Sequence, residues 1–449
     1  MTNAFSNNLG CPGQRLTWRW LWILALLAFF VGLFAQTARA QTQSPYATAT
    51  TLAAAARYEE ALRVLQNWSP TEAASREQKT WARAVILRQL GRHDDALPLL
   101  EDLVARRPDI PRFRIALGET LTALGQTERA KLHLEESRLA AETEADRTRA
   151  AAGLGAITNK SDWSGRLSFS AINSSNAAQR TSAQTITLLG TNFVINPTAR
   201  KQAAKGLQVQ AGLTFAPRIG PRTRLRTGLS AEARYYSKSV PTDVKLRAET
   251  TLVFDVTPSL SIEGGVTFSR RWIDEKPYSQ GPGLAFAMTA FPTQRSRLDL
   301  IAMLDRVIHD RSPGLDGHQG TGLLSYTYAL SPQLHLNGLL RAERTDAALA
   351  SASSTALEAG IGATMMLTGG MRMGLTASYR GTAYDAAAPL FAKTRYDRQT
   401  RATLRASHSK LQINGFTPEL EVQYTKRTSN IVIYSYDELS ASVGLTRRF

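Results

Sequence analysis

The stretch "DELSASVGLTRRF" (residues 437–449) closes the chain and alternates apolar and polar side chains with a period of two. Leu439, Ala441, Val443 and Leu445 fall on one face, while serine, glycine and threonine occupy most of the other. This alternation predicts a β-strand with one apolar face. The chain then ends on an aromatic residue, Phe449.

Similar segments recur from residue 162 onward, among them "GLQVQAGLTF" (206–215), "SLSIEGGVTF" (259–268) and "PELEVQY" (418–424). Alternating segments of about ten residues, separated by turn residues, are typical of a transmembrane β-barrel. The segments indicate about 14 strands, and 12 or 16 also fit the rule that such barrels have even strand numbers. The barrel is assigned to residues 159–449, with a soluble β-sandwich or soluble barrel as the alternative.

The connections between these segments alternate in length. Short turns fall at residues 217–221, 256–259, 291–294, 330–333 and 368–370, and longer polar loops around 173–203, 237–243, 272–281, 308–318, 346–353 and 385–394. Outer-membrane barrels have short periplasmic turns and longer external loops. The last strand therefore ends at the periplasmic rim, where Phe449 is predicted to join the interfacial aromatic girdle and to act as a barrel assembly signal.

The polar face of the predicted strands carries charges of both signs, which a water-filled lumen can accommodate. We predict these residues to line the lumen: Arg224, Arg226, Glu232, Arg234, Lys245, Arg247, Glu249, Arg297, Asp299, Arg401 and Arg405. Arg341, Glu343 and Asp305 continue the pattern.

The N-terminal segment has the pattern of a secretory signal peptide. Arg15 and Arg19 precede the apolar run "LWILALLAFFVGLF" (21–34), and an Ala-x-Ala site ends at Ala40. We predict cleavage after Ala40, with an uncleaved anchor as the alternative, although the run is short for a spanning helix. The sole cysteine, Cys11, lies within the segment to be removed, so disulfides and thiolate metal sites are excluded from the mature chain.

Composition narrows the class of partner. The 449 residues are 43% hydrophobic with a formal net charge of +17, and signal removal takes away three basic residues and no acidic one. Because the chain is exported, this charge favours contact with anionic lipid headgroups or acidic partners over nucleic acid.

Motifs of enzymes and phosphate-binding loops are absent from the sequence. We therefore predict that the protein is not an enzyme and has no cofactor. His309 and His318 could form a metal site, but a solvated loop is the favoured interpretation. His335 is expected to form a hydrogen bond in the lumen.

Residues 41–158 carry a different pattern, with Ala, Leu, Glu and Arg at helical spacing. Ala61, Ala96 and Ala130 recur in related motifs at steps of 35 and 34 residues, and Gly91 and Gly125 are 34 residues apart. A 34-residue period is that of the tetratricopeptide repeat, a stack of paired helices. About three repeats fit, with a plain helical bundle as the alternative.

The closing segment "GFTPELEVQYTKRTSNIVIYSYDELSASVGLTRRF" (415–449) resembles that of the surface lipoprotein assembly modulator family, the translocators of type XI secretion. The segments "WSGRLSFSAINSSN" (163–176) and "INPTARKQAAKGLQV" (195–209) are similar too. The resemblance implies a non-enzymatic outer-membrane translocator that delivers lipoproteins or soluble secreted proteins to the cell surface. Its implied partners are this cargo, outer-membrane lipids, the barrel assembly machinery and periplasmic chaperones, with the helical domain in the periplasm. A polysaccharide export barrel with similar repeats and a general porin are the alternatives.

Overall fold

A computed structural model describes residues 44–449, apart from residues 161, 189, 238, 239, 389, 392, 409, 410 and 412. The predicted signal peptide and its cleavage site at Ala40 lie outside the described residues. The chain divides into two compact units, Met1–Ser69 and Pro70–Phe449. In the described part of the first unit, helices α2 (Pro45–Ala54) and α3 (Tyr58–Asn67) pack against each other.

The second unit begins with five helices: α4 (Ala73–Gln89), α5 (His93–Arg106), α6 (Pro111–Ala123), α7 (Thr127–Ala140) and α8 (Glu144–Lys160). The two glycines of the 34-residue period end the first helix of a pair: Gly91 follows α4 with φ 72° and Gly125 follows α6 with φ 75°. Glycine adopts this left-handed conformation without steric cost, so the helix ends there. None of the described helices is both long and apolar enough to cross a membrane.

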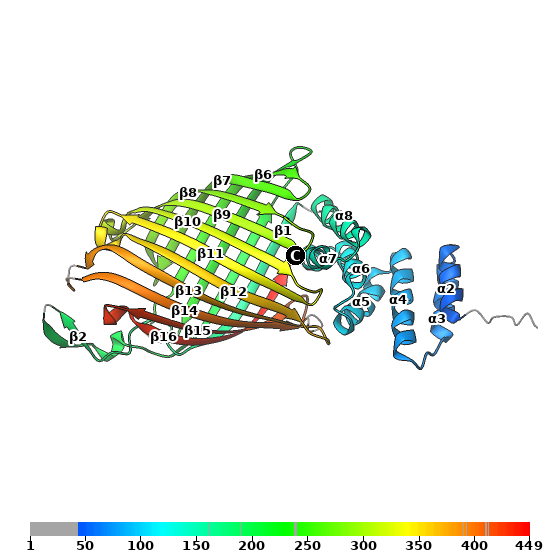
Figure 1. The fold of residues 1–449 in the computed structure, drawn as a ribbon, viewed down its shortest axis with the longest axis horizontal. Coiled ribbons are helices and arrows are strands. Elements are labelled where there is room, and N and C mark those ends of the chain that lie inside the picture. Colours follow the sequence, from blue (N-terminus) through cyan, green and yellow to red (C-terminus); the bar gives the residue numbers. More distant parts are fainter. Residues whose placement is uncertain are drawn as a thin grey trace, which may run out of the picture. The chain divides into compact units, whose positions relative to one another are not determined.

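Fourteen antiparallel strands close into a barrel in the order β1-β16-β15-β14-β13-β12-β11-β10-β9-β8-β7-β6-β5-β4 (Figure 1), which confirms the predicted fold class. Their bounds are β1 (Trp163–Ser174), β4 (Ala204–Phe215), β5 (Thr223–Tyr236), β6 (Asp243–Thr257), β7 (Leu260–Ile273), β8 (Lys276–Ala290), β9 (Ser296–His309), β10 (Gly317–Ala329), β11 (Leu334–Ala347), β12 (Ser354–Met366), β13 (Met371–Ala388), β14 (Lys393–His408), β15 (Thr417–Ser429) and β16 (Tyr436–Arg448). Two short strands, β2 (Thr185–Leu188) and β3 (Thr191–Val194), form a separate hairpin between β1 and β4.

Alternation along the strands divides the barrel into two faces. On β16, Leu439 and Val443 are 51% and 63% exposed, while Glu438, next to Leu439, is buried. The same outward exposure of large apolar side chains recurs around the wall, at Leu207, Leu229, Phe254, Val266, Leu284, Leu304, Leu340, Ile361 and Leu375. Closure gives each of the fourteen barrel strands a partner on both sides, which is what a lipid environment requires of a spanning β-structure.

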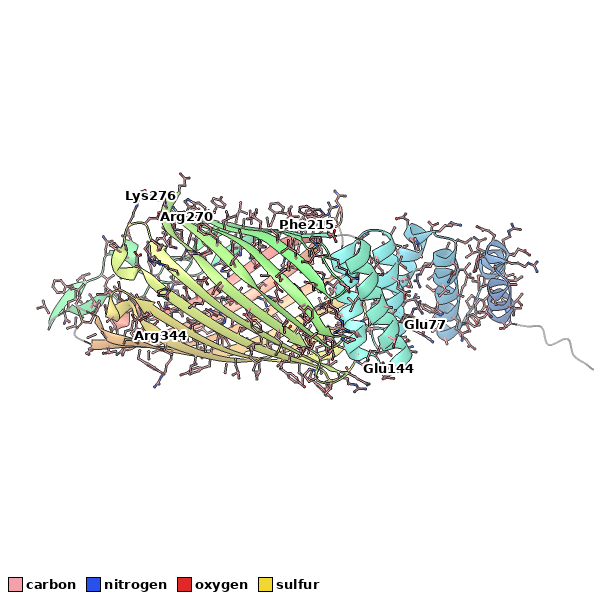
Figure 2. The ribbon with its side chains drawn as sticks, turned by 90° about the horizontal axis from the view of Figure 1, so that it is seen from above. Glu77, Glu144, Phe215, Arg270, Lys276 and Arg344 are labelled. Atoms are coloured by element: carbon pink, nitrogen blue, oxygen red, sulfur yellow. The ribbon has the colours of Figure 1, made fainter. Side chains whose placement is uncertain are left out.

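The two ends of the barrel are distinguished by their connections (Figure 2). Arg270, Lys276 and Arg344 lie at the end remote from the helices, whereas Phe215 lies near the helices. The helix-proximal end carries short turns such as residues 258–259 and 367–370, and four of the remote loops contain one-turn 3-10 helices. The helix-proximal end is therefore the periplasmic one.

One predicted loop is wrong. Residues 272–281 were expected to form a longer external loop, but β7 runs to Ile273 and β8 begins at Lys276. The connection is only Asp274 and Glu275, with φ values of 49° and 62°. Two successive residues with positive φ match the twist of a tight hairpin. The polar residues expected in a loop lie instead on strand ends.

Candidate translocation lumen

The concave face of the wall carries paired charges. Arg226 on β5 lies 3.0 Å from Glu249 on β6 and 2.7 Å from Glu263 on β7. Because β5 does not pair with β7, Arg226 reaches Glu263 across β6, a path that is open on the inner side of a curved wall. Arg247 on β6 similarly lies 3.7 Å from Asp305 on β9.

A second group of charges continues this row on β11 to β14. Arg380 on β13 contacts Glu343 on β11 and lies 3.9 Å from Glu358 on β12. Arg341 lies 3.6 Å from Glu343, and Arg401 lies 4.0 Å from Glu358. We call these ten residues the lumenal girdle: Arg226, Arg247, Arg341, Arg380, Arg401, Glu249, Glu263, Asp305, Glu343 and Glu358. Its five cations and five carboxylates balance, so the girdle is a neutral, cross-linked wall.

The remaining residues predicted to line the lumen form local pairs with neighbouring carboxylates or cations. These pairs are Arg224 with Asp255 (3.4 Å), Arg234 with Glu232 (2.8 Å), Lys245 with Asp243 (3.6 Å), Arg297 with Asp299 (2.9 Å) and Arg405 with Glu421 (2.6 Å). The structure thus brings Arg226 and Glu249 into one cluster and leaves Arg224, Lys245 and Arg405 in separate pairs.

Near the joint between β1 and β16 the inner wall has a different character. Ser168, Ser170, Gln208, Gln210 and Ser442 project there from β1, β4 and β16. They line one side of a polar cavity of about 930 Å³. The cavity therefore lies against a wall of small, hydrogen-bonding side chains rather than against the girdle.

Helix α7 closes the periplasmic side of this cavity. Lys131, Leu132 and Glu135 of α7 line it together with the barrel wall. The helix contacts β1 and β16 at one side of the mouth and β10 at another. In the closed strand order β10 lies seven positions from β1, which is halfway round the barrel. Helix α7 thus spans the diameter of the periplasmic mouth.

Glu136 of α7 anchors the helices to the barrel. Its carboxylate lies 3.1 Å from the Arg114 guanidinium of α6 and contacts Arg372 of β13. All three groups are within one network, and Arg114 and Glu136 are buried. Burial alone opposes ionisation of the carboxyl, but Arg372 and Arg114 outweigh it and lower the pKa of Glu136 below its ordinary value. Removing one partner would leave a buried charge uncompensated.

Further contacts surround this anchor. The Arg138 guanidinium lies 3.4 Å from the ring centroid of Phe291, in the turn between β8 and β9. The amide of Gly369 donates a 2.6 Å hydrogen bond to the carbonyl of Ala105 at the end of α5. Glu135 lies 3.6 Å from Arg297 of β9. These contacts join the helical domain to the turns and strand ends of the β8 to β13 half of the barrel.

The histidines singled out from the sequence occupy two places. His335 on β11 is buried beside the Glu136 network, and within the part of the chain that the structure describes its Nε2 atom has no hydrogen-bond partner. His309 and His318 lie on β9 and β10 rather than in a loop, and the His309 ring meets Tyr278 edge-on at 5.4 Å. Among the described residues there is no group of three or more side chains suited to hold a metal ion.

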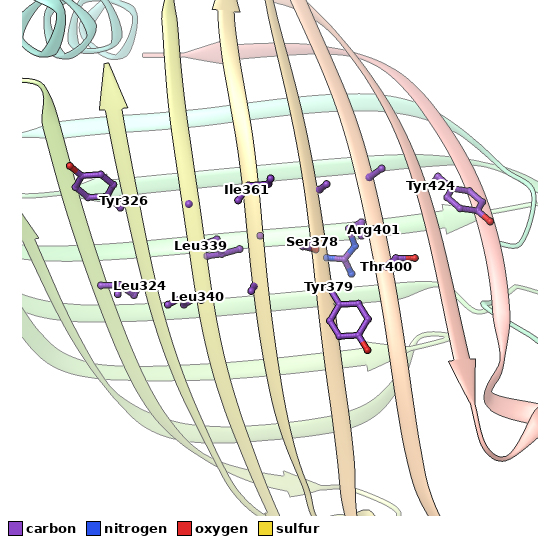
Figure 3. A pocket seen from close by; sticks show the side chains of 15 residues that line it. Leu324, Tyr326, Leu339, Leu340, Ile361, Ser378, Tyr379, Thr400, Arg401 and Tyr424 are labelled. Atoms are coloured by element: carbon purple, nitrogen blue, oxygen red, sulfur yellow. The ribbon is translucent and has the colours of Figure 1, made fainter. Parts of the chain in front are cut away.

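An apolar depression of about 680 Å³ lies on the outer wall over β10 to β15 (Figure 3). Small residues such as Gly338, Ala359 and Ala377 form its floor, and Tyr326 and Tyr379 are among the larger side chains around it. Ile361, which also lines it, is 74% exposed. The depression is part of the lipid-facing surface.

The closed barrel, its polar lumen and the repeat helices at one mouth define a transport barrel of the outer membrane. The family model described as surface lipoprotein assembly modifier matches residues 163–449, and a tetratricopeptide repeat model matches residues 87–154. The chain belongs to the surface lipoprotein assembly modifier family, which confirms the resemblance seen in the sequence. Its barrel lies in the outer membrane and its helical domain in the periplasm, and the family is one of transport barrels rather than a class of enzyme.

The chain is similar to several solved structures at low identity. The TodX monoaromatic hydrocarbon channel is 10% identical, with 64% of this chain and 91% of that chain covered and a TM-score of 0.38. A bacterial polysaccharide outer membrane secretin is 10% identical (64% and 98% covered, TM-score 0.36), as is a FadL homologue from Pseudomonas aeruginosa (64% and 89%, TM-score 0.37). Similarity at this level says nothing about what passes through the barrel. No curated protein matches the chain.

Proposed function

We propose that this protein exports proteins, either lipoproteins or soluble secreted proteins, from the periplasm to the cell surface through its lumen. The family to which the chain belongs supports lipoprotein as the cargo class. The single observation that favours controlled export over passive diffusion is helix α7, which spans the mouth from β1 and β16 to β10. Cargo can enter only when α7 moves, so transport is gated at the periplasmic side.

In this proposal the chain reaches the outer membrane after signal cleavage at Ala40, and the barrel assembly machinery inserts it with Phe449 as part of the signal. Periplasmic chaperones keep the cargo unfolded, and outer-membrane lipids surround the apolar wall. The lumen-lining residues predicted from the sequence, from Arg224 to Arg405, form the polar path. Polysaccharide export and general porin function remain the competing proposals.

A cross-link that fixes α7 to the barrel tests the gated export. The double variant Glu135→Cys, Arg297→Cys places two thiols at positions whose side chains lie 3.6 Å apart. The mature chain expected after cleavage has no other cysteine, so a short thiol-reactive cross-linker acts only there. Export is measured on intact cells by the protease accessibility of a surface lipoprotein of the same cells. We expect surface cargo to fall at least tenfold after cross-linking.

The matched control fixes the other end of the barrel. Arg344→Cys, Asp385→Cys replaces an external ion pair of 2.6 Å between β11 and β13, and its cross-linking should leave export unchanged. Undiminished export with the Glu135–Arg297 cross-link in place would refute gating by α7. Unchanged surface display after deletion of the whole gene would refute protein export itself. Steady ion conductance of the purified barrel with α7 cross-linked would instead favour a porin.

A further inference from the structure

Two successive acidic residues of α7 contact two arginines on separate strands of the barrel. Glu135 lies 3.6 Å from Arg297 on β9, and Glu136 contacts Arg372 on β13. Three strands lie between β9 and β13 in the barrel order, so the pair of carboxylates bridges different parts of the mouth. An acidic dipeptide therefore occupies a basic receptor formed by the barrel.

The receptor continues into the cavity beyond α7. The barrel wall around this cavity contributes six arginines and only two glutamates: Arg166, Arg234, Arg297, Arg372, Arg405, Arg448, Glu419 and Glu421. Two of these arginines are well exposed to solvent: the side chains of Arg166 and Arg405 are 47% and 64% exposed. Glu232 and Asp299 also pair with Arg234 and Arg297, so six arginines face four carboxylates of the barrel. Unlike the balanced girdle, this vestibule therefore keeps an excess of positive charge, which attracts anionic segments.

We propose that the basic vestibule is a binding site for an acidic polypeptide segment, and that Glu135 and Glu136 of α7 occupy this site while the mouth is closed. The ligand class follows from the present occupant, because carboxylates carried by a polypeptide already reach both Arg297 and Arg372. The carboxylates of an incoming acidic segment take the place of those of α7, so Arg297 and Arg372 keep a partner when α7 moves away. The neighbouring wall of Ser168, Ser170 and Gln208 supplies hydrogen-bonding groups for the backbone of that segment.

This inference rests on the proposed function for its biological meaning, but binding can be measured without export. The full chain is purified in detergent and titrated with a fluorescent glutamate-rich peptide, with a glutamine-rich peptide and a lysine-rich peptide of equal length as comparisons. We expect the glutamate-rich peptide to bind more tightly than both. Glu135→Gln weakens the binding of α7 to the vestibule. It should therefore raise the affinity for the glutamate-rich peptide about fivefold, which is the effect of one partly exposed ion pair.

Substitutions on the receptor side should act in the opposite direction. Arg297→Gln and Arg405→Gln are each expected to lower the affinity for the glutamate-rich peptide about fivefold. Arg344→Gln is the matched control, because this arginine pairs with Asp385 at the external end and should leave binding unchanged. Arg372→Gln is avoided as the main test, since it leaves the buried Glu136 with only Arg114.

Each outcome bears on the proposal. Equal affinities for the glutamate-rich and glutamine-rich peptides, or an effect of Arg344→Gln as large as that of Arg297→Gln, would overturn it. Competition by inorganic phosphate at the same concentration as the peptide would also overturn it, because the site would then recognise any anion. If the glutamate-rich peptide binds more tightly than the other two but the protein has no export activity, the proposed function is refuted and the binding site still stands.

Discussion

The ring of Phe449 lies directly over the α-carbon of Gly165, so closely that a β-carbon at Gly165 would stand 2.4 Å from the ring. The two residues also exchange backbone hydrogen bonds, at 2.7 Å from the Gly165 amide and 3.0 Å from the Phe449 amide. These bonds extend the joint between β1 and β16 beyond its nine registered residue pairs. The last residue of the chain is therefore a structural part of barrel closure.

Replacing Gly165 should impair closure. Gly165→Val forces the Phe449 ring away from the rim, and we expect the folded fraction of the barrel to fall severalfold. The measurement is the amount of heat-modifiable barrel in outer membranes on electrophoresis. Gly338→Val is the matched control on the lipid-facing side of β11, because an added β-carbon there meets nothing within 4 Å. Equal losses in the two variants would contradict a specific role for the Gly165–Phe449 contact.

Acidification should loosen the helical domain from the barrel. Burial and the nearby Arg114, Arg129 and Arg372 lower the pKa of His133 on α7 from 6.5 to about 3, against the opposing effect of Glu136. The unfolded chain therefore binds a proton below pH 6.5 that the folded chain does not, so stability falls as pH drops through this range. The lowered pKa of Glu136 acts in the same direction below pH 4.5.

Between pH 7.5 and pH 5.5 we expect the His133 contribution to cost about 1 kcal/mol of helical-domain stability. Thermal melting followed by the helical circular dichroism signal at both pH values provides the measurement. The variant His133→Gln has no such proton to bind and should show a smaller difference between the two pH values. An unchanged pH dependence in His133→Gln would assign the effect to other groups.

The tight turn between β7 and β8 predicts a stabilising substitution. Glu275 has φ 62°, a conformation that costs a residue with a β-carbon more than glycine. Glu275→Gly should stabilise the hairpin by about 0.5 kcal/mol and raise the temperature at which the barrel loses heat-modifiability. Asp274 is kept, because its carboxylate accepts a 2.9 Å hydrogen bond from the amide of Thr242. A lower transition temperature would show that the turn is not strained at Glu275.

The lumenal girdle predicts coupling between Arg226 and Glu263. Arg226→Gln leaves Glu249 and Glu263 without their shared cation, and we expect a loss of about 1 kcal/mol, limited by the partial exposure of these groups. Glu263→Gln in the same chain removes one of the two carboxylates and should recover part of that loss. Additive losses in urea unfolding of the single and double variants would indicate independent side chains.

Local patterns in the sequence were sufficient to predict the fold class. Alternation with a period of two marks each strand, and one apolar face is required by lipid, so the strand number follows from counting segments. Gly91 and Gly125 marked the 34-residue period, and they recur because a left-handed residue at the end of a helix favours glycine. The turn at Asp274 and Glu275 was missed since neither residue is the glycine or asparagine typical of such a turn.

The junction between the helices and the barrel could not be read from the sequence. Glu136 and Arg372 are 236 residues apart, and neither belongs to a recognisable motif. Glu136 follows Glu135 in what resembles an ordinary solvated helix face, and only the placement of α7 against β13 makes it a buried anchor. The charged residues of the strands were predictable because their alternation is local, whereas their partners two or three strands away were not.

The course of α7 across the mouth also constrains the order of assembly. This helix is synthesised before every strand, yet it contacts both β1 and β16, the first and last strands of the barrel. Its complete docking surface exists only after the final strand has joined the first. Seating of α7 should therefore be the last event of biogenesis, and a half-built barrel cannot be sealed. Docking of α7 therefore distinguishes a closed barrel from an incomplete one.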